Sequence, residues 1–269
     1  MKQLLKRIFL RIVNFRETAQ FLYWYFFHKN WPAGKIIELM GNKGHLAGLT
    51  FDLNNPYIQT HLKSRFLFHT YEDGHDKMIS RFLNPKLPVV EFGGCIGVVS
   101  CFTNRLLEDP QQHVVIEAQP FLIETLEKNR NQNGCSFEII NAAVAYGSEF
   151  VDFWINPTSF IGNSIKAGKG GKTVKVAATS LKQIIDNYGF DRITLIADIE
   201  GAETELVDNE LELMQRVVET LIIELHPREV DAGPVATNNL KANLAEAGFE
   251  EIFQSGNDFV YKNKSIKYV

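Results

Sequence analysis

The sequence predicts a doubly wound α/β fold with a mostly parallel sheet of seven strands. Two features support this prediction. The stretch VVEFGGCIG, residues 89–97, is a short apolar run that ends in a glycine-rich turn, and VVIEA, residues 114–118, is a second apolar run that ends in an acid. From Pro88 onward such runs alternate with segments of helical periodicity, which is typical of a parallel sheet built from βαβ units.

Length and composition limit the class of protein. The chain has 269 residues, of which 45% are hydrophobic, so it can bury the core of one α/β domain with an added segment. Its net charge of −4 argues against binding of nucleic acid through a basic surface. Cys95, Cys101 and Cys135 lack metal-ligand spacing, and no secretory signal is evident, so we expect reduced thiols and a cytoplasmic location.

Residues 1–45 are predicted to form an amphipathic helical extension, separate from a main domain at 46–269. Basic side chains alternate with apolar ones at nearly helical spacing, and an aromatic cluster follows. The basic residues are Lys2, Lys6, Arg7, Arg11 and Arg16, and the aromatic ones are Phe21, Tyr23, Trp24, Tyr25, Phe26, Phe27 and Trp31. Two interpretations stay open. Residues 1–31 contact the inner face of a membrane peripherally, or the helix packs on the main domain or on a second copy in a homodimer.

The remaining elements follow in order. Alternation of Leu49, Phe51 and Leu53 predicts a strand, and a turn is expected at Asn54-Asn55-Pro56-Tyr57. The strands predicted after Pro88 are 89–93, 113–117, 136–141, 193–198, 219–225, 249–254 and 257–262, and the helices are 98–108, 120–132, 180–188, 203–215 and 237–247. The last two strands, joined at Gly256-Asn257, predict an antiparallel C-terminal hairpin. Residues 147–178 are an insertion, expected to hold one strand at 150–155 and then a mobile surface loop that serves as a lid.

The glycine-rich turn indicates which cofactor the fold binds, since ligands bind βαβ units at the carboxyl ends of their strands. Cys95 stands where the dinucleotide fingerprint has its second glycine, and no Gly-Lys-Ser/Thr follows to make a P-loop. The spacing of Gly93 and Gly97 after Glu91 fits S-adenosylmethionine better, because that cofactor has no phosphate. Glu117, at the end of the second strand, suits a ribose diol.

Five segments resemble, in sequence and in order, the motifs of the FkbM-type methyltransferases. They are EFGGCIG (91–97), VIEAQP (115–120), NAAV (141–144), LIADIEGAE (195–203) and IIELHP (222–227). The resemblance covers about residues 68–262, and DIEGAE is its most specific part. Two segments differ from the usual pattern. Residues 91–95 replace Asp-x-Gly-Ala-Asn, and Glu117-Ala118 replaces Glu-Pro, but both keep the acid and the essential glycines.

The resemblance implies a class I methyltransferase that uses S-adenosylmethionine. We expect Glu91, Gly93 and Gly97 around the methionine end of the cofactor, and Asn141 and Ala142 beside the adenine. Tyr71-Glu72 matches a pair that often precedes the first motif in similar sequences. Glu72 is therefore either a residue that holds the charged end of the cofactor or a plain surface acid.

The groups that act on the acceptor are expected at the ends of the fourth and fifth strands. Asp198 and Glu200 follow the fourth strand, and Glu224 and His226 end the fifth, on the same face because strand side chains alternate. Three assignments stay open. His226 is the general base, oriented by Asp198 or Glu224; Asp198 is itself the base; or Asp198, Glu224 and His226 hold a divalent metal that binds a diol. Glu203 either joins this site or favours the start of its helix electrostatically.

Taken together, these features predict an S-adenosylmethionine-dependent O-methyltransferase for a hydroxyl, favouring that of a sugar in a glycan or glycolipid. The acidic and histidine cluster suits hydrogen bonding to a polyol, and the N-terminal helix suits a lipid-linked acceptor. The alternatives are a methyltransferase for a small secondary metabolite and a non-catalytic protein that binds S-adenosylmethionine. A nicotinamide-dependent dehydrogenase is disfavoured by Cys95. No nucleic-acid partner is expected.

Overall fold

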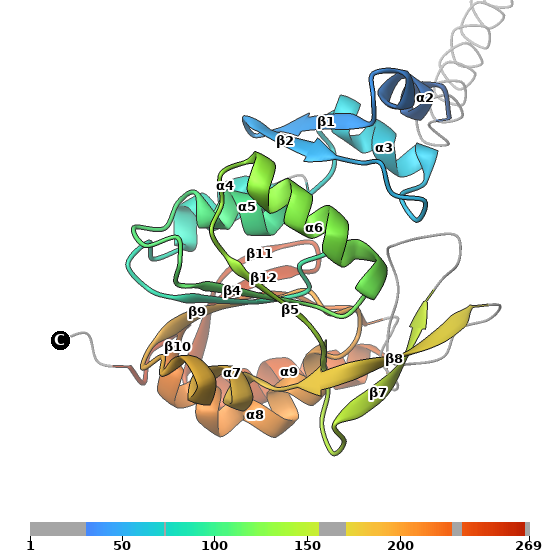
Figure 1. Ribbon diagram of the computed structural model, residues 1–269. Coiled ribbons are helices and arrows are strands. Elements are labelled where there is room, and N and C mark those ends of the chain that lie inside the picture. The colour runs from blue at the N-terminus through green and yellow to red at the C-terminus, as the bar shows by residue number, and fades with distance from the viewer. Residues whose placement is uncertain (1–30, 73, 156–170, 228–232, 267–269) are drawn as a thin grey trace, which may run out of the picture. The chain divides into compact units, whose positions relative to one another are not determined.

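The computed structural model describes residues 31–72, 74–155, 171–227 and 233–266 (Figure 1). Contacts divide the chain into two compact units, residues 1–73 and 74–269, called here the N-terminal unit and the main unit. The sequence-based boundary after residue 45 falls inside a hairpin of the N-terminal unit. Most of the amphipathic extension and most of the expected lid loop, at 1–30 and 156–170, lie outside the described residues.

In the described residues 31–72, the N-terminal unit contains two short helices and a β-hairpin. Its elements are α2 (Trp31–Leu39), β1 (Lys43–Leu46), β2 (Leu49–Asp52) and α3 (Thr60–Leu67). The strands pair antiparallel through Ala47 and Gly48, both at positive φ, as tight hairpins require. Leu49, Phe51 and Leu53 are buried, as their alternation predicts. The turn expected at residues 54–57 is present, with the Asn55 side chain accepting the backbone N–H of Tyr57 at 2.9 Å.

The main unit is built on a seven-stranded sheet in the order β11-β12-β10-β9-β3-β4-β5. The strands are β3 (Val89–Phe92), β4 (His113–Glu117), β5 (Glu138–Asn141), β9 (Ile193–Ala197), β10 (Val218–Glu224), β11 (Phe249–Ser255) and β12 (Asp258–Asn263). The first five are parallel to their neighbours among themselves, whereas β12 is antiparallel to both β10 and β11. The predicted sheet and its antiparallel C-terminal hairpin are therefore confirmed.

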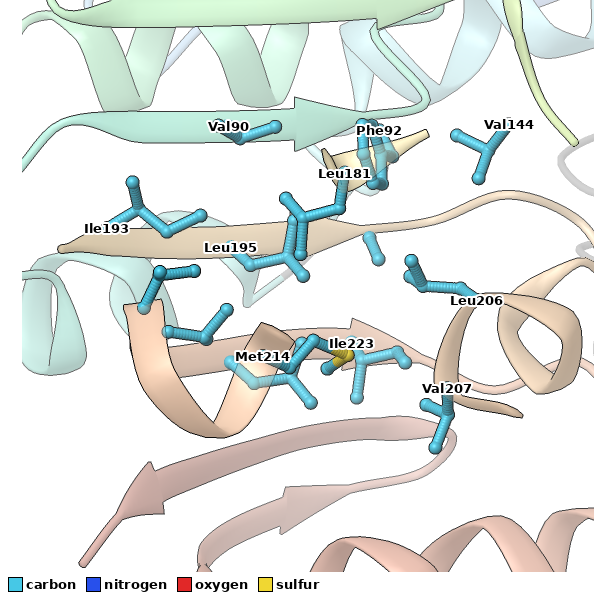
Figure 2. Close-up of a cluster of buried hydrophobic side chains, with 14 of the residues drawn as sticks. Val90, Phe92, Val144, Leu181, Ile193, Leu195, Leu206, Val207, Met214 and Ile223 are labelled. Atoms are coloured by element: carbon cyan, nitrogen blue, oxygen red, sulfur yellow. The ribbon is translucent and has the colours of Figure 1, made fainter. Parts of the chain in front are cut away.

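Helices cover both faces of this sheet (Figure 1). They are α4 (His75–Phe82), α5 (Val98–Asn104), α6 (Pro120–Gln132), α7 (Leu181–Tyr188), α8 (Glu203–Val217) and α9 (Pro234–Glu246). Strand side chains alternate between two cores. Leu195 and Ile223 pack with Leu206 and Met214 of α8 (Figure 2), whereas Ile196 and its neighbours pack against α4 and α5.

The insertion after β5 is more regular than expected. Residues 172–179, expected to continue the surface loop, form β8 (Lys172–Thr179), which pairs antiparallel with β7 (Phe150–Ile155) and parallel with the short β6 (Ala143–Val144). The cause lies in the alternating sequence KTVKVAAT, which buries Val176 on one side of the strand. The glycines and lysines that precede residue 172 in the sequence predict a loop, so the strand is not expected from the sequence.

Candidate active site

The glycine-rich turn follows β3 and lies against the ends of β9 and β4. Gly93 has φ +98°, and a Cβ atom there would lie 1.9 Å from the carbonyl oxygen of Asp198. Its N–H donates to the carbonyl oxygen of Ile116 at 2.9 Å. Gly97 also has positive φ, +87°, and a Cβ there would lie 2.7 Å from Leu126 of α6. Only glycine fits both positions without displacing a neighbour.

Glu117 ends β4, and its carboxylate connects the glycine-rich turn after β3 with the start of α6. Its carboxylate accepts the N–H of Cys95 at 2.6 Å and that of Gln119 at 2.7 Å. The side chain is only 4% exposed, and this burial raises its pKa to about 7, against the lowering effect of its backbone hydrogen bonds. Cys95 reaches it in a left-handed conformation, φ +48°.

Asn141, Ala142 and Glu72 are further predicted cofactor-binding residues, and they lie in different parts of the chain. Asn141 ends β5 and donates from Nδ2 to the carbonyl oxygen of Glu117 at 2.7 Å, and the next residue, Ala142, is buried. Their contact with adenine stays a prediction. Glu72 belongs to the N-terminal unit, and its role also stays a prediction.

Glu91, on β3, is a buried acid with two polar side-chain partners. It is 1% exposed, and its two oxygens lie 2.5 Å from the Ser100 hydroxyl and 3.1 Å from Nε2 of the buried His113. Sequence reasoning did not find His113. The strand register contains the signal, because Val89 pairs with His113 and Glu91 with Val115, which places Glu91 near the histidine on adjacent strands. Its place at the methionine end stays a prediction.

The four predicted catalytic residues lie together at the carboxyl ends of β9 and β10. Nε2 of His226 is 3.6 Å from Oδ1 of Asp198, 3.6 Å from Oε2 of Glu200 and 3.7 Å from Oε1 of Glu224. Glu200 takes a left-handed conformation, φ +50°, which turns the chain between the strand and α8. Their proximity follows from the parallel pairing of β9 with β10.

Glu203, whose role the sequence left open, contacts His226 more closely than these three carboxylates do. Its Oε1 accepts from Nδ1 of His226 at 2.8 Å, and the same carboxylate accepts the N–H of Gly201 at 3.0 Å. Burial alone would lower the pKa of His226. The hydrogen bond and charge of Glu203, with the charges of Asp198 and Glu200, raise it to about 10. The ring is thus an imidazolium at neutral pH.

The cluster also offers ligands to a divalent cation. Asp198, Glu224 and His226 each place one ligand atom within 4.8 Å of the others, and His75, Glu224 and Asp258 form a second such group. His75 Nε2 and Asp258 Oδ1 are 3.1 Å apart. The nitrogen and carboxylate donors suit several divalent metals, so a metal stays open as an alternative.

The strand order, the glycine turn after β3 and the acid that ends β4 define a Rossmann-like methyltransferase fold. A family model described as the methyltransferase FkbM domain matches residues 91–251, more than half of the chain. The chain therefore belongs to the FkbM methyltransferase family and is a methyltransferase.

Solved structures match the chain at low sequence identity and with TM-scores below 0.5. One is a protein of the NADB-Rossmann superfamily from Streptococcus agalactiae, with 13% identity and a TM-score of 0.43 over 72% of this chain and 70% of that chain. Another is precorrin-6y C5,15-methyltransferase from Geobacter metallireducens, with 12% identity and a TM-score of 0.42 over 71% of this chain and 87% of that chain. No curated protein matches the sequence. Within the described ranges, none of the helices combines the length and apolar character needed to cross a membrane.

Proposed function

We propose that this methyltransferase uses S-adenosylmethionine to methylate a hydroxyl of a sugar in a glycan or glycolipid. The observation that carries the proposal is the position of the acidic cluster beside the glycine turn. The backbone of Asp198 passes so close to Gly93 that a Cβ atom there would lie 1.9 Å from it. A ligand on the turn and an acceptor at the cluster would therefore meet at one edge of the sheet.

The residues at the turn fit the proposed cofactor. Glu117 is an acceptor-only carboxylate when ionised, and each of its oxygens has a further lone pair beyond the backbone hydrogen bond it already accepts. Ribose hydroxyls would supply donors to those lone pairs. Gly93 and Gly97 would let the methionine end approach the backbone. When bound, S-adenosylmethionine supplies a methyl group activated on a sulfonium.

The cluster fits a hydroxyl acceptor. Asp198 has the most exposed side chain of the four, at 41%, compared with 25% for Glu200, 28% for Glu224 and 15% for His226. Carboxylates that share one edge can each accept a hydrogen bond from vicinal hydroxyls, as polyols require. The imidazolium of His226 offsets the repulsion between them.

Asp198 is the general base in this proposal. Transfer would break the bond between the sulfonium and the methyl group and form one from the methyl group to the acceptor oxygen, and the Asp198 carboxylate would accept the proton that the acceptor hydroxyl loses. His226 cannot take that proton at neutral pH, because its pKa of about 10 leaves it already protonated. Glu203 and His226 then act as positioning residues that hold the site in shape.

The test of this assignment is the isosteric change Asp198→Asn in the full-length protein. We expect turnover to fall about a hundredfold or more, the usual loss for a general base, with affinity for S-adenosylhomocysteine within about twofold of wild type. Asp208→Asn is the matched control, since Asp208 is an exposed acid on α8. Unchanged turnover in Asp198→Asn would refute the assignment.

The acceptor class is tested with S-adenosylmethionine that carries a labelled methyl group. A panel should contain methyl glycosides, isolated glycolipids, small amines and nucleic acid. We expect label to enter the sugar-containing acceptors in a base-stable ether. Transfer only to amines or to nucleic acid would contradict the proposal, and transfer only to small non-sugar alcohols would favour a secondary metabolite.

A lipid-linked acceptor is supported by the surface of α2. Ile36, Leu39 and Met40 are exposed, Leu39 to 88% of its surface, and they follow the basic, aromatic segment of residues 1–31. We infer that this part of the chain contacts an anionic membrane surface. Full-length protein should sediment with anionic but not neutral liposomes, and less so at high salt.

The exposed face of α2 can be tested separately in the full-length chain. The double change Leu39→Gln and Met40→Gln should weaken sedimentation, whereas Val235→Gln, at an exposed apolar residue of the main unit, should not. Protein that never sediments with anionic liposomes but elutes as a dimer would contradict the membrane proposal and favour docking on a second copy.

A further inference from the structure

Two cysteines of the main unit lie in contact although 34 positions separate them. Cys101 is on α5, and Cys135 is in the connection between α6 and β5. Sγ of Cys135 lies 3.6 Å from the carbonyl oxygen of Cys101. Cys101 is fully buried, whereas Cys135 is partly exposed beside Gly134, which is an exposed turn glycine.

We propose that Cys101 and Cys135 are a redox modification site, in which the two thiols form a reversible disulfide with a small disulfide such as oxidised glutathione as the oxidant. The closeness of the two residues is the first support, because a disulfide requires its two cysteines to be neighbours in space, and the Cys135 sulfur already contacts the Cys101 backbone. The difference in exposure is the second, because one thiol is open to a small reagent and the other is shielded from it.

The charges around the pair assign the first attack to Cys135. The hydrogen bond from Cys101 lowers the pKa of the Cys135 thiol, against the effect of burial, and the positive charges of Arg105 and Arg130 lower it further. The same shared hydrogen bond raises the pKa of Cys101, and burial adds to this. Cys135 therefore gives up its proton first, and the thiolate is the nucleophile in disulfide exchange.

The reaction balances in two exchange steps. The Cys135 thiolate attacks one sulfur of oxidised glutathione, forms a mixed disulfide and releases one glutathione thiolate. Cys101 is then no longer beside a thiolate, so the interaction with Cys135 that raised its pKa is gone. Cys101 loses its proton, attacks the sulfur of Cys135 and releases the second glutathione thiolate. Two protein thiols are oxidised by two electrons in total, and one small disulfide is reduced to two thiols.

The pair is connected to the glycine turn. A Cβ atom at Gly97 would lie 3.8 Å from Sγ of Cys101, and Asn129 of α6 donates from Nδ2 to the carbonyl oxygen of Ile96 at 2.7 Å. A disulfide would tie α5, which begins directly after the turn, to the chain that follows α6. We therefore expect oxidation to change the affinity for S-adenosylhomocysteine at least threefold. This expectation, unlike the disulfide itself, rests on the proposed function.

The experiment equilibrates full-length protein with oxidised glutathione, removes the reagent and counts free thiols after unfolding. The count should fall from three to one, and reductant should restore it. Non-reducing tryptic mapping should then find residues 87–105 joined to residues 131–166. Because the first peptide holds both Cys95 and Cys101, the Cys95→Ser variant is the control, and its cross-link should persist. Cys135→Ser should abolish it.

Three results would overturn the proposal. They are a count that stays at three, a stable glutathione adduct on Cys135 with Cys101 still free, and a cross-link that is lost in Cys95→Ser. If the reduced protein fails to bind S-adenosylhomocysteine at all, the proposed function is at fault, and the thiol count still decides whether the disulfide forms.

Discussion

The raised pKa of Glu117 makes cofactor affinity depend on pH in a calculable way. Burial raises this pKa to about 7 in the free protein, and ribose hydroxyls would donate much more strongly to the ionised carboxylate than to the protonated one. The ionised fraction then rises from about one tenth at pH 6 to about nine tenths at pH 8. Binding favours the ionised form, so affinity rises with pH, and the expected gain for S-adenosylhomocysteine is about tenfold over this interval.

The assay is calorimetric titration of wild type and Glu117→Gln with S-adenosylhomocysteine at several pH values between 5.5 and 8.5. The amide has no charge to titrate and should bind weakly with an affinity that is nearly constant across the interval. His226, with a pKa of about 10, stays protonated throughout and does not contribute. A flat profile in wild type, or the same slope in Glu117→Gln, would refute the reasoning.

Three further predictions concern stability and charge. Gly93→Ala should lower the free energy of unfolding by about 3 kcal/mol or more, because the added Cβ would lie 1.9 Å from the carbonyl oxygen of Asp198. Gly189→Ala, also at positive φ but with open space around it, is the control and should lower it by only about 1 kcal/mol. Equal losses of the two variants in chemical denaturation would contradict the clash. Glu203→Gln should lower the pKa of His226 by at least one pH unit in an NMR titration. Because the folded-state pKa is raised, protonated His226 stabilises the fold fully below pH 6.5, and this stabilisation is lost as the pH rises to about 10. Glu203→Gln should therefore be less stable than wild type at pH 6. An unchanged pKa of His226 in the variant would refute the contact with Glu203. Ser180→Ala removes the capping box of α7 and should cost about 1 kcal/mol in urea unfolding, whereas no loss would show that the cap is not formed.

The sequence predicts those parts of the fold that repeat a simple pattern. Runs such as 89–93 and 193–198 are mostly apolar, and their strands are confirmed to within a residue or two. β8 is different, because its alternation of Lys and Val follows a glycine-rich stretch that indicates a loop. Its pairing with β7 decides the outcome, and that pairing joins residues about 20 apart in sequence.

The candidate site, too, can be predicted from the sequence only in part. Asp198, Glu200, Glu224 and His226 can be grouped from sequence, because each lies at the end of a strand whose neighbour the fold class specifies. The contact of Glu203 with His226 cannot, since it depends on how α8 starts above the sheet. That contact also bears on the chemistry, because it raises the pKa of His226, one of the two candidate bases.

Glu91 illustrates why residue type alone does not assign a role. An acid at the start of a glycine motif predicts a place beside the cofactor, which stays a prediction, but it does not predict that the side chain contacts Ser100 and His113. Only the register of β3 on β4 reveals that partner.

The central claim is that this chain binds S-adenosylmethionine at the turn after β3 and uses Asp198 for chemistry rather than for binding. Calorimetric titration of wild type and Asp198→Asn with S-adenosylhomocysteine and with NAD tests it most directly. We predict micromolar binding of S-adenosylhomocysteine by both proteins, equal within about twofold, and no binding of NAD. Binding of NAD alone, or loss of S-adenosylhomocysteine binding in Asp198→Asn, would contradict the account.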